Sequence, residues 1–305
     1  MATSRVIIKP LEQWQIAVCL CVCAYLVLGK ITYTLRPYHW FMLLVIPGVI
    51  LVAEHGRRFF TDWSPMFAFW LIYDRLRWLQ PLLLSRVAVE LPYKIEQWLF
   101  GDICAGSIPA HTLRAWLALH SSEPIARAIS LTAQLVYLSH IAVLPILLFG
   151  WWLKSRYWDN NHDQFRLHLR AFTILNVMTI LSYLLIPVAP PWWVSLHGSA
   201  QPSIQLIAQT STAAAMDGKI VQKLIATAPM WFGAVPSLHG AYPVLLFLLA
   251  QRRRGWLTLI VIGVYAAAMW GATVVLNQHY IVDLVIGAVF AFVAYWLTEK
   301  IKLLK

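Results

Sequence analysis

Charged residues are scarce in this chain. Of its 305 residues only 12% are Asp, Glu, Lys or Arg, whereas 60% are hydrophobic and the mean hydropathy is +0.66. A soluble domain of this length needs a more polar surface, so the composition excludes that class. Because the apolar residues form long runs, the sequence predicts an all-α, polytopic helical membrane protein.

Acidic residues are fewer than basic ones. The chain has 13 Asp and Glu against 24 Lys and Arg, which gives a net charge of +11. In a membrane protein this excess is typical of cytoplasmic loops and of contacts with anionic headgroups. No compact basic patch with interleaved aromatic residues occurs, so we expect no nucleic-acid partner.

Cysteine is also rare. Cys19, Cys21 and Cys23 alternate inside an apolar run, and Cys104 stands alone. These spacings suit neither a zinc site nor a disulfide framework, and we expect packed apolar residues. No other spacing indicates a metal site, so we expect no metal and no cofactor.

The first apolar run lacks a small-residue cleavage site, so we do not expect a cleaved signal.

Eight apolar segments are long enough, or nearly long enough, to cross a membrane. They are roughly 14–35, 40–54, 63–79, 126–153, 167–189, 238–250, 256–276 and 281–298. Three are short for a hydrocarbon core of ~30 Å, so six to eight crossings are expected. Since no internal repeat or low-complexity linker is present, we expect one membrane domain over 1–305, with a motif-bearing core at about 126–299.

Basic residues cluster in alternate loops. With a cytoplasmic N-terminus the inner segments are 1–13, 54–62, 154–170, 251–255 and 299–305, and these carry more than half of the Lys and Arg residues. The positive-inside rule favours this arrangement, with both termini cytoplasmic and the loops before 238 and 281 extracytoplasmic. The outer segments 80–124 and 190–236 are either interfacial amphipathic helices that cover a site or solvated loops.

Two polar stretches interrupt the last apolar segments on that outer side. In "NQHYIVDLVIG", His279 and Asp283 are four residues apart and share one helix face. A carboxylate there accepts the proton of one imidazole nitrogen and leaves the other as a lone pair, which suits a nucleophile or a base. The alternative is a polar pair that only caps the last helix.

The other stretch is "GAVPSLHGAY", where Ser237 and His239 follow a proline at a helix start. Backbone N–H groups at a helix N-terminus bind anions, and Ser237 can cap the helix or donate its hydroxyl to a phosphate oxygen. Gly233 and Gly240 would let the backbone approach a ligand. The alternative is an ordinary helix start with an incidental histidine, although ionisable residues inside a membrane usually serve function.

The two stretches resemble the two signature motifs of the type 2 phosphatidic acid phosphatase superfamily. "PSLH", "HYIVDL" and the "IPVAPPW" at 186–192 are most similar to the inositol phosphorylceramide synthase, or aureobasidin-resistance, branch. The resemblance covers residues 180–290 well and the first 120 residues only loosely. It implies a metal-independent enzyme in which His279 attacks phosphorus and becomes a phosphohistidine, Asp283 orients His279, and His239 transfers the proton.

The sequence departs from this family at its usual phosphate-binding arginine. Ala272 and Thr273 occupy the positions of a Ser-Arg pair, so positive charge must come from elsewhere. We expect it from Arg75 and Arg77, whose guanidinium groups could bind phosphate in two-point contacts. The alternative for them is pairing with Asp74 or with headgroups. Further candidates for phosphate contact are Ser237, Leu238, Gly240 and Lys219, with Lys223 and Arg114 as weaker options; His140 is expected to be a hydrogen-bonded core residue.

The function expected is transfer of a phosphorylated, inositol phosphate-like headgroup between membrane lipids at the extracytoplasmic face. The missing arginine favours transfer, because a phosphodiester carries less charge than a phosphomonoester. One alternative is a lipid phosphate or polyprenyl diphosphate phosphatase with water as the acceptor. A second, from another class, is a non-enzymatic lipid-binding protein or transporter. The expected partners are a phospholipid donor and a lipid or polyol acceptor, and the sequence leaves the oligomeric state open.

Overall fold

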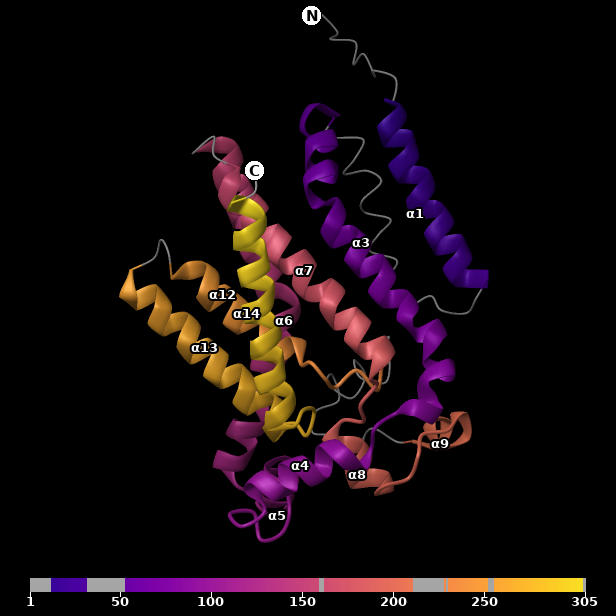
Figure 1. Cartoon of the computed structure of the whole chain (residues 1–305), viewed down its shortest axis with the longest axis vertical. Coiled ribbons are helices and arrows are strands. Elements are labelled where there is room, and N and C mark those ends of the chain that lie inside the picture. The colour runs from indigo at the N-terminus through magenta and orange to yellow at the C-terminus, as the bar shows by residue number, and fades with distance from the viewer. Residues whose placement is uncertain are drawn as a thin grey trace, which may run out of the picture. The chain divides into compact units, whose positions relative to one another are not determined.

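The computed structural model describes residues 12–31, 53–158, 162–210, 228, 230–251 and 255–303 (Figure 1). Within these residues the regular structure is helical, with two isolated β-bridges and no strand. The predicted all-α membrane fold is therefore confirmed. The chain forms two compact units, Met1–Ala68 and Phe69–Lys305. The single membrane domain and the motif-bearing core expected from the sequence stay predictions.

The first unit contains α1 (Gln13–Ile31) and the first part of α3 (Ala53–Leu83). Helix α1 forms over the predicted apolar run, and its Trp14 ring lies 6.0 Å from that of Phe60. The segment predicted at 40–54 falls almost wholly outside the described residues. Helix α3 contains the segment predicted at 63–79 and is longer at both ends.

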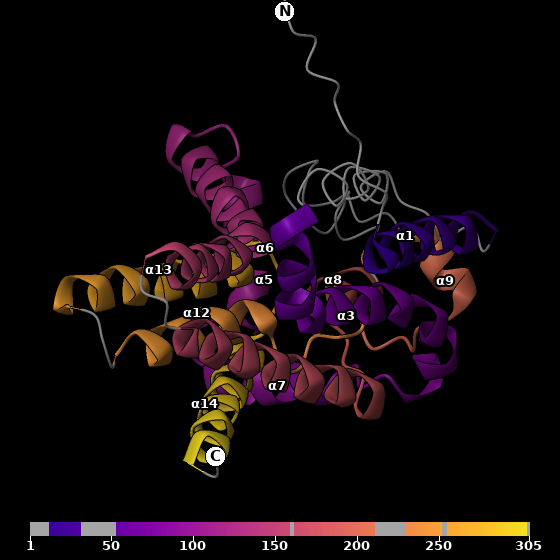
Figure 2. The ribbon, with the colours of Figure 1, turned by 90° about the horizontal axis from the view of Figure 1, so that it is seen from above.

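The second unit is built around α12 (Leu238–Ala250). This helix contacts the other four long helices of the unit (Figure 2): α6 (Pro124–Tyr157), α7 (Asp163–Leu185), α13 (Trp256–Val275) and α14 (Ile281–Leu303). Each of the five corresponds to a predicted apolar segment, and the bounds of α12 match. The two polar stretches therefore lie at the starts of two helices that pack against each other.

Four described helices are long and apolar enough to cross a membrane, namely α1, α7, α13 and α14. Helix α6 becomes a fifth if its two halves, which are bent by 43° between His140 and Ala142, form one span. Pro145 explains the position of the bend, because its ring displaces the carbonyl four residues earlier, at Ile141. The number of six to eight crossings stays a prediction.

Short helices lie at the end of the second unit where α14 begins (Figure 1). They are η2 (Leu84–Arg86), α4 (Glu90–Phe100), α5 (Pro109–Leu119), α8 (Pro191–His197) and α9 (Ile204–Gln209). Helix α4 buries Pro92 and Glu96 and exposes Leu91, Ile95 and Trp98, so amphipathic helices do form in the predicted segment 80–124. Their placement at a membrane interface stays a prediction.

A bridge of three extended segments joins distant parts of the chain at this end. Ala88 pairs in parallel with Val188, and Val188 pairs in parallel with Gly233. The bridge contains hydrogen bonds from Ala88 N to Pro187 O (2.9 Å) and from Val188 N to Phe232 O (2.7 Å). The "IPVAPPW" stretch is thus the middle segment, and it fixes the chain just before Pro236 and Ser237.

Two glycines bring α12 and α14 together. A Cβ at Gly240 would lie 2.9 Å from Cα and O of Leu284, and one at Gly287 would lie 2.4 Å from O of Ser237. The sequence suggested that Gly240 lets the backbone approach a ligand; in the structure its near neighbour is the neighbouring helix. The helix starts can be this close only because both positions lack a side chain.

Gly287→Ala is expected to lower the free energy of unfolding by about 1–3 kcal/mol, because its methyl group would push α14 away from Ser237. Gly271→Ala in α13 is the matched control, since a Cβ there has nothing within 4 Å. The measurement is unfolding of both purified variants in detergent. Equal stability of the two variants would contradict the assigned role of Gly287.

Candidate active site

His279 and Asp283 meet at the start of α14. His279 Nδ1 lies 3.3 Å from Asp283 Oδ2, and the same oxygen accepts a 3.0 Å hydrogen bond from the N–H of Tyr280. Asp283 is fully buried and His279 is 8% exposed. The contact expected from the sequence is present, but the two residues do not share a helix face, because His279 lies two residues before α14 begins at Ile281. The contact leaves Nε2 of His279 directed away from the carboxylate.

Ser237 connects the second polar stretch to the first. Its hydroxyl caps α12 by accepting a hydrogen bond from the N–H of Gly240 (3.2 Å), as the sequence suggested. Its own N–H donates to the backbone O of Asp283 at 3.2 Å. Both motifs are therefore hydrogen-bonded to the same residue, Asp283. The adjacent Leu238 is buried as the first residue of the helix.

The two candidate histidines touch directly. Nδ1 of His239 lies 3.2 Å from Nε2 of His279. All these contacts are satisfied when each histidine carries its proton on Nδ1, so that His279 donates to Asp283 and His239 donates to His279. Nε2 of His239 is buried and has no hydrogen-bond partner within the described chain. The result is a directed relay from His239 through His279 to Asp283.

Two residues of α6 enclose His239. The Tyr137 ring stacks on the His239 ring with centroids 4.4 Å apart, and the His140 ring lies 3.9 Å away on centroids. Nδ1 of His140 bonds to O of Tyr137 at 2.8 Å, which confirms the expected hydrogen-bonded residue. The sequence did not reveal that His140 lies against His239, because that contact depends on how α6 packs on α12.

The end of α7 holds the loop before Ser237. The hydroxyl of Tyr183 donates to O of Pro236 at 3.0 Å, and the hydroxyl of Ser182 donates to O of Val235 at 3.2 Å. The Val235–Pro236 peptide bond is cis. These bonds and the three-segment bridge fix the carbonyl groups of the loop on both sides of the proline.

Glu96 of α4 is a site residue that the sequence analysis missed. Its carboxylate is fully buried and accepts hydrogen bonds from the N–H groups of Ile281 (2.9 Å) and Val282 (3.2 Å). Burial raises the pKa of Glu96, the two N–H bonds oppose that rise, and nearby Asp283 adds to it. Glu96 therefore caps α14 from another helix, two residues after His279.

A second polar group supports the chain just before His279. Asn277 has a positive φ of 60°, and its amide donates to the hydroxyl of Ser195 at 2.9 Å. That hydroxyl lies 2.8 Å from Nε2 of His111, which is also 3.0 Å from O of Pro191. Burial lowers the pKa of His111, and its contact with O of Pro191 partly opposes that shift. The loop just before His279 is thus fixed by residues of α5 and α8. The sequence "NQH" by itself gives little indication of this support.

The predicted cations differ in their surroundings. Arg75 lies 3.8 Å from Asp74 and 4.9 Å above the Trp78 ring, which is the pairing that the sequence offered as the alternative. Arg77 instead has a buried Nη1 atom without a hydrogen-bond partner among the described residues. Thr273 is buried and bonds to O of Trp270, so it supplies no charge. Lys219 and Lys223 lie outside the described residues.

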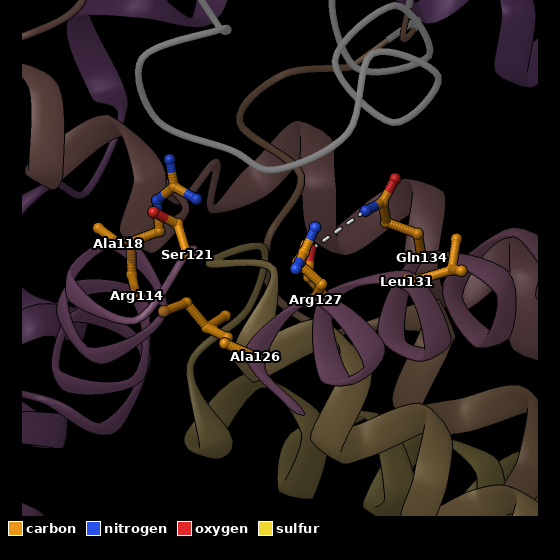
Figure 3. Close-up of a pocket in the computed structure, with 9 residues that line it drawn as sticks. Arg114, Ala118, Ser121, Ala126, Arg127, Leu131 and Gln134 are labelled. Atoms are coloured by element: carbon orange, nitrogen blue, oxygen red, sulfur yellow. Dashed lines mark hydrogen bonds between the residues drawn. The ribbon is translucent and has the colours of Figure 1, made fainter. Parts of the chain in front are cut away.

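Arg114 lines a separate cavity. This cavity of about 540 Å³ lies between α5 and α6, and Figure 3 shows Arg114 and Arg127 lining it from the two helices. Arg127 donates to O of Ser122 at 3.0 Å. The lining extends along α6 to Gln134, three residues before Tyr137, but it includes neither Tyr137 nor His140 nor His239. Arg114 therefore does not belong to the group of side chains around His239.

The described residues thus form a helical membrane protein whose two helix starts bring two histidines and an aspartate together. No group of three or more His, Cys, Asp or Glu side chains among them is arranged to hold a metal ion. The sequence profile of the PAP2 superfamily matches residues 110–297, and the chain belongs to this superfamily. It is a membrane enzyme, a phosphotransferase or phosphatase of lipid phosphate esters, which excludes the non-enzymatic alternative.

Individual relatives extend the comparison. Over 302 residues the chain is 25% identical to a phosphoinositol dihydroceramide synthase of Bacteroides thetaiotaomicron, with 97% of this chain and 94% of that protein aligned. It is 28% identical over 138 residues to an inositol phosphorylceramide synthase of Candida albicans, covering 42% of this chain and 28% of that protein. No solved structure matches. The resemblance to the synthase branch is confirmed.

Glu96→Ala is expected to lower the free energy of unfolding by roughly 2 kcal/mol, because the N–H groups of Ile281 and Val282 lose a charged acceptor. Glu96→Gln keeps one acceptor and should cost less. Glu90→Ala is the control, since Glu90 is exposed on the same helix and paired with Lys94. Detergent unfolding compares the three; a loss no greater in Glu96→Ala than in the control would refute the capping role.

The pH dependence of stability gives a second readout for Glu96. Because its pKa is raised above the ordinary 4.5, the folded protein holds this proton more tightly than the unfolded chain does. From about pH 4.5 upward the wild type should therefore lose stability relative to Glu96→Gln as the carboxyl ionises. Parallel stability profiles for the two proteins would show that Glu96 is not the titrating group.

Proposed function

We propose that the chain transfers a phosphorylated polyol headgroup, of the phosphoinositol kind, from a phospholipid to the hydroxyl group of a ceramide-like lipid. The observation that carries the proposal is the relay His239–His279–Asp283, which provides a nucleophilic nitrogen next to a proton donor. The relative aligned along 97% of the chain is named for phosphoinositol and dihydroceramide, which supports both substrate classes.

In the first step, Nε2 of His279 attacks phosphorus and the bond from phosphorus to the diacylglycerol oxygen breaks. For this attack the phosphate must displace His239 from its contact with His279, because Nδ1 of His239 lies 3.2 Å from Nε2 of His279 in the structure. His239, which carries a second proton on Nε2 in this step, donates its Nδ1 proton to the leaving diacylglycerol oxygen and becomes a neutral imidazole. Asp283 stabilises the charge that His279 acquires through the Nδ1 contact.

In the second step, His239 takes the proton of the acceptor hydroxyl group, whose oxygen attacks phosphorus as the P–N bond to His279 breaks. The acceptor decides the outcome: a lipid alcohol gives a new phospholipid, and water gives a free phosphate ester. A lipid phosphate or polyprenyl diphosphate phosphatase remains the second candidate, because the same relay serves both. Named relatives in the synthase branch favour transfer.

We place this reaction on the extracytoplasmic side, with both termini cytoplasmic. The support is the distribution of Lys and Arg, which is richest in the inner segments defined above. The helix starts that carry Ser237 and Ile281 lie at the same end of the second unit as the amphipathic helices α4 and α5 (Figure 1). A lipid could therefore bring its headgroup to His279 from the membrane interface.

His279→Ala is expected to abolish transfer, because no other described nitrogen contacts both His239 and Asp283. The assay offers purified protein phosphatidylinositol with ceramide, and separately phosphatidate and a polyprenyl diphosphate. A new phosphoinositol lipid identifies the transferase, and free phosphate identifies the phosphatase. Unchanged turnover in His279→Ala, or no acid-labile phosphohistidine on quenching the wild type, would contradict the mechanism.

Arg77→Gln is expected to lower kcat/KM by about 10- to 100-fold, because a half-buried guanidinium that binds the substrate phosphate would contribute roughly 1.5–3 kcal/mol. Arg75→Gln, which loses a guanidinium already paired with Asp74, should have a much smaller effect. The two substitutions lie two positions apart on α3, and each removes one positive charge. Equal losses in both would assign the effect to overall charge.

A further inference from the structure

Three buried N–H donors at one end of the second unit have no hydrogen-bond partner in the described parts of the chain. They are Arg77 Nη1 and Gln80 Nε2 of α3, and Trp231 Nε1 of the loop before Gly233. Gln80 is only 9% exposed. A buried donor left unpaired is costly, and a group of them requires an explanation.

Packing places the three donors in one neighbourhood. Arg77 and Gln80 are three residues apart and share a face of α3. One turn further, Leu84 belongs to the apolar cluster against which Trp231 packs, and Leu83 packs with Met230. The end of α3 and the segment 230–232 therefore lie side by side.

This neighbourhood adjoins the histidine relay. Tyr73, one turn before Arg77, packs with Tyr183, whose hydroxyl is bonded to O of Pro236. Tyr73 also lies within electrostatic range of Tyr137, which stacks on His239. A ligand held by the three donors would thus have its phosphate near the reacting histidines.

The chemistry of the donors selects the ligand. A guanidinium, an amide and an indole N–H need acceptor oxygens, and a cationic headgroup such as choline or ethanolamine would be repelled by Arg77. The half-buried Trp231 ring, held edge-on against the buried Trp192 ring with centroids 5.8 Å apart, adds an apolar surface against which the C–H face of a cyclic polyol can pack. The group therefore suits a phosphate that carries several hydroxyl groups.

We infer that Gln80 and Trp231, beside Arg77, bind the hydroxyl groups of a polyol attached to the substrate's phosphate and so determine the headgroup specificity. This inference rests on the proposed function, because it assigns the headgroup of the lipid whose phosphate reaches His279. It adds two residues that the histidine motifs do not contain. A pocket built to pair with hydroxyl groups discriminates strongly against a headgroup that lacks them.

The test measures binding without turnover, in the full-length His279→Ala protein. Its probes are dioleoyl-phosphatidylinositol and dioleoyl-phosphatidylcholine in detergent micelles. The His279→Ala protein should bind phosphatidylinositol at least about 10-fold more tightly than phosphatidylcholine. Adding Gln80→Met or Trp231→Phe should weaken phosphatidylinositol binding about 10-fold and leave phosphatidylcholine unchanged.

Stability separates a ligand role from a structural one. Gln80→Met removes an unpaired buried donor, so the melting temperature of the lipid-free protein should rise. The matched control is Gln201→Met, because the Gln201 amide donates to O of Leu84 and O of Val87; this change should lower the melting temperature and keep the lipid preference. A lower melting temperature in Gln80→Met with unchanged preference would overturn the inference.

Failure of the inference and of the proposed function can be told apart. If the wild type makes no phosphoinositol lipid but phosphatidylinositol binding still depends on Gln80 and Trp231, the transfer reaction is wrong and the binding site stands. If transfer occurs but Gln80→Met and Trp231→Phe leave the lipid preference of the His279→Ala protein unchanged, the inference is wrong and the reaction stands.

Discussion

Asp283 is the buried residue on which the positions of both histidine-bearing stretches depend. Its side chain accepts hydrogen bonds from His279 and from the N–H of Tyr280, and its backbone oxygen accepts one from Ser237. The two histidines are forty residues apart in sequence, yet they meet because one residue anchors both helix starts. Gly240 and Gly287 make that meeting sterically possible by removing side chains between the helices.

A second layer of contacts keeps these helix starts in place. Glu96 supplies acceptors to the first turn of α14, while Asn277, Ser195 and His111 fix the loop before it. Val188 lies between Ala88 and Gly233 and fixes the chain before Pro236. The candidate histidines are thus held at or beside helix starts, an arrangement that would keep a nucleophile and a proton donor in a productive geometry under the proposed mechanism.

Much of the fold and part of the candidate site could be predicted from the sequence, whereas the remaining contacts of the site depend on how the helices pack. The spacing of four residues predicts the contact of His279 with Asp283, although His279 lies before α14, and the apolar pattern predicts the bounds of α12. Glu96 could not be found in this way, because "LPYKIEQWLF" resembles any amphipathic helix and its partner lies 185 residues away. Likewise Arg75 and Arg77 lie about 200° apart around α3, so only packing shows that Arg77 has a buried Nη1 atom without a hydrogen-bond partner among the described residues.

The cap on α14 also bears on how such an enzyme can be divided or recombined. The superfamily profile begins at residue 110, yet Glu96 and Ala88, which hold the catalytic helix starts, precede it. A chimera that joins the catalytic core of one relative to the leading segment of another would keep every reacting residue and could still lose their alignment. The structural unit that holds the two helix starts therefore extends upstream of the family boundary, at least as far as Ala88.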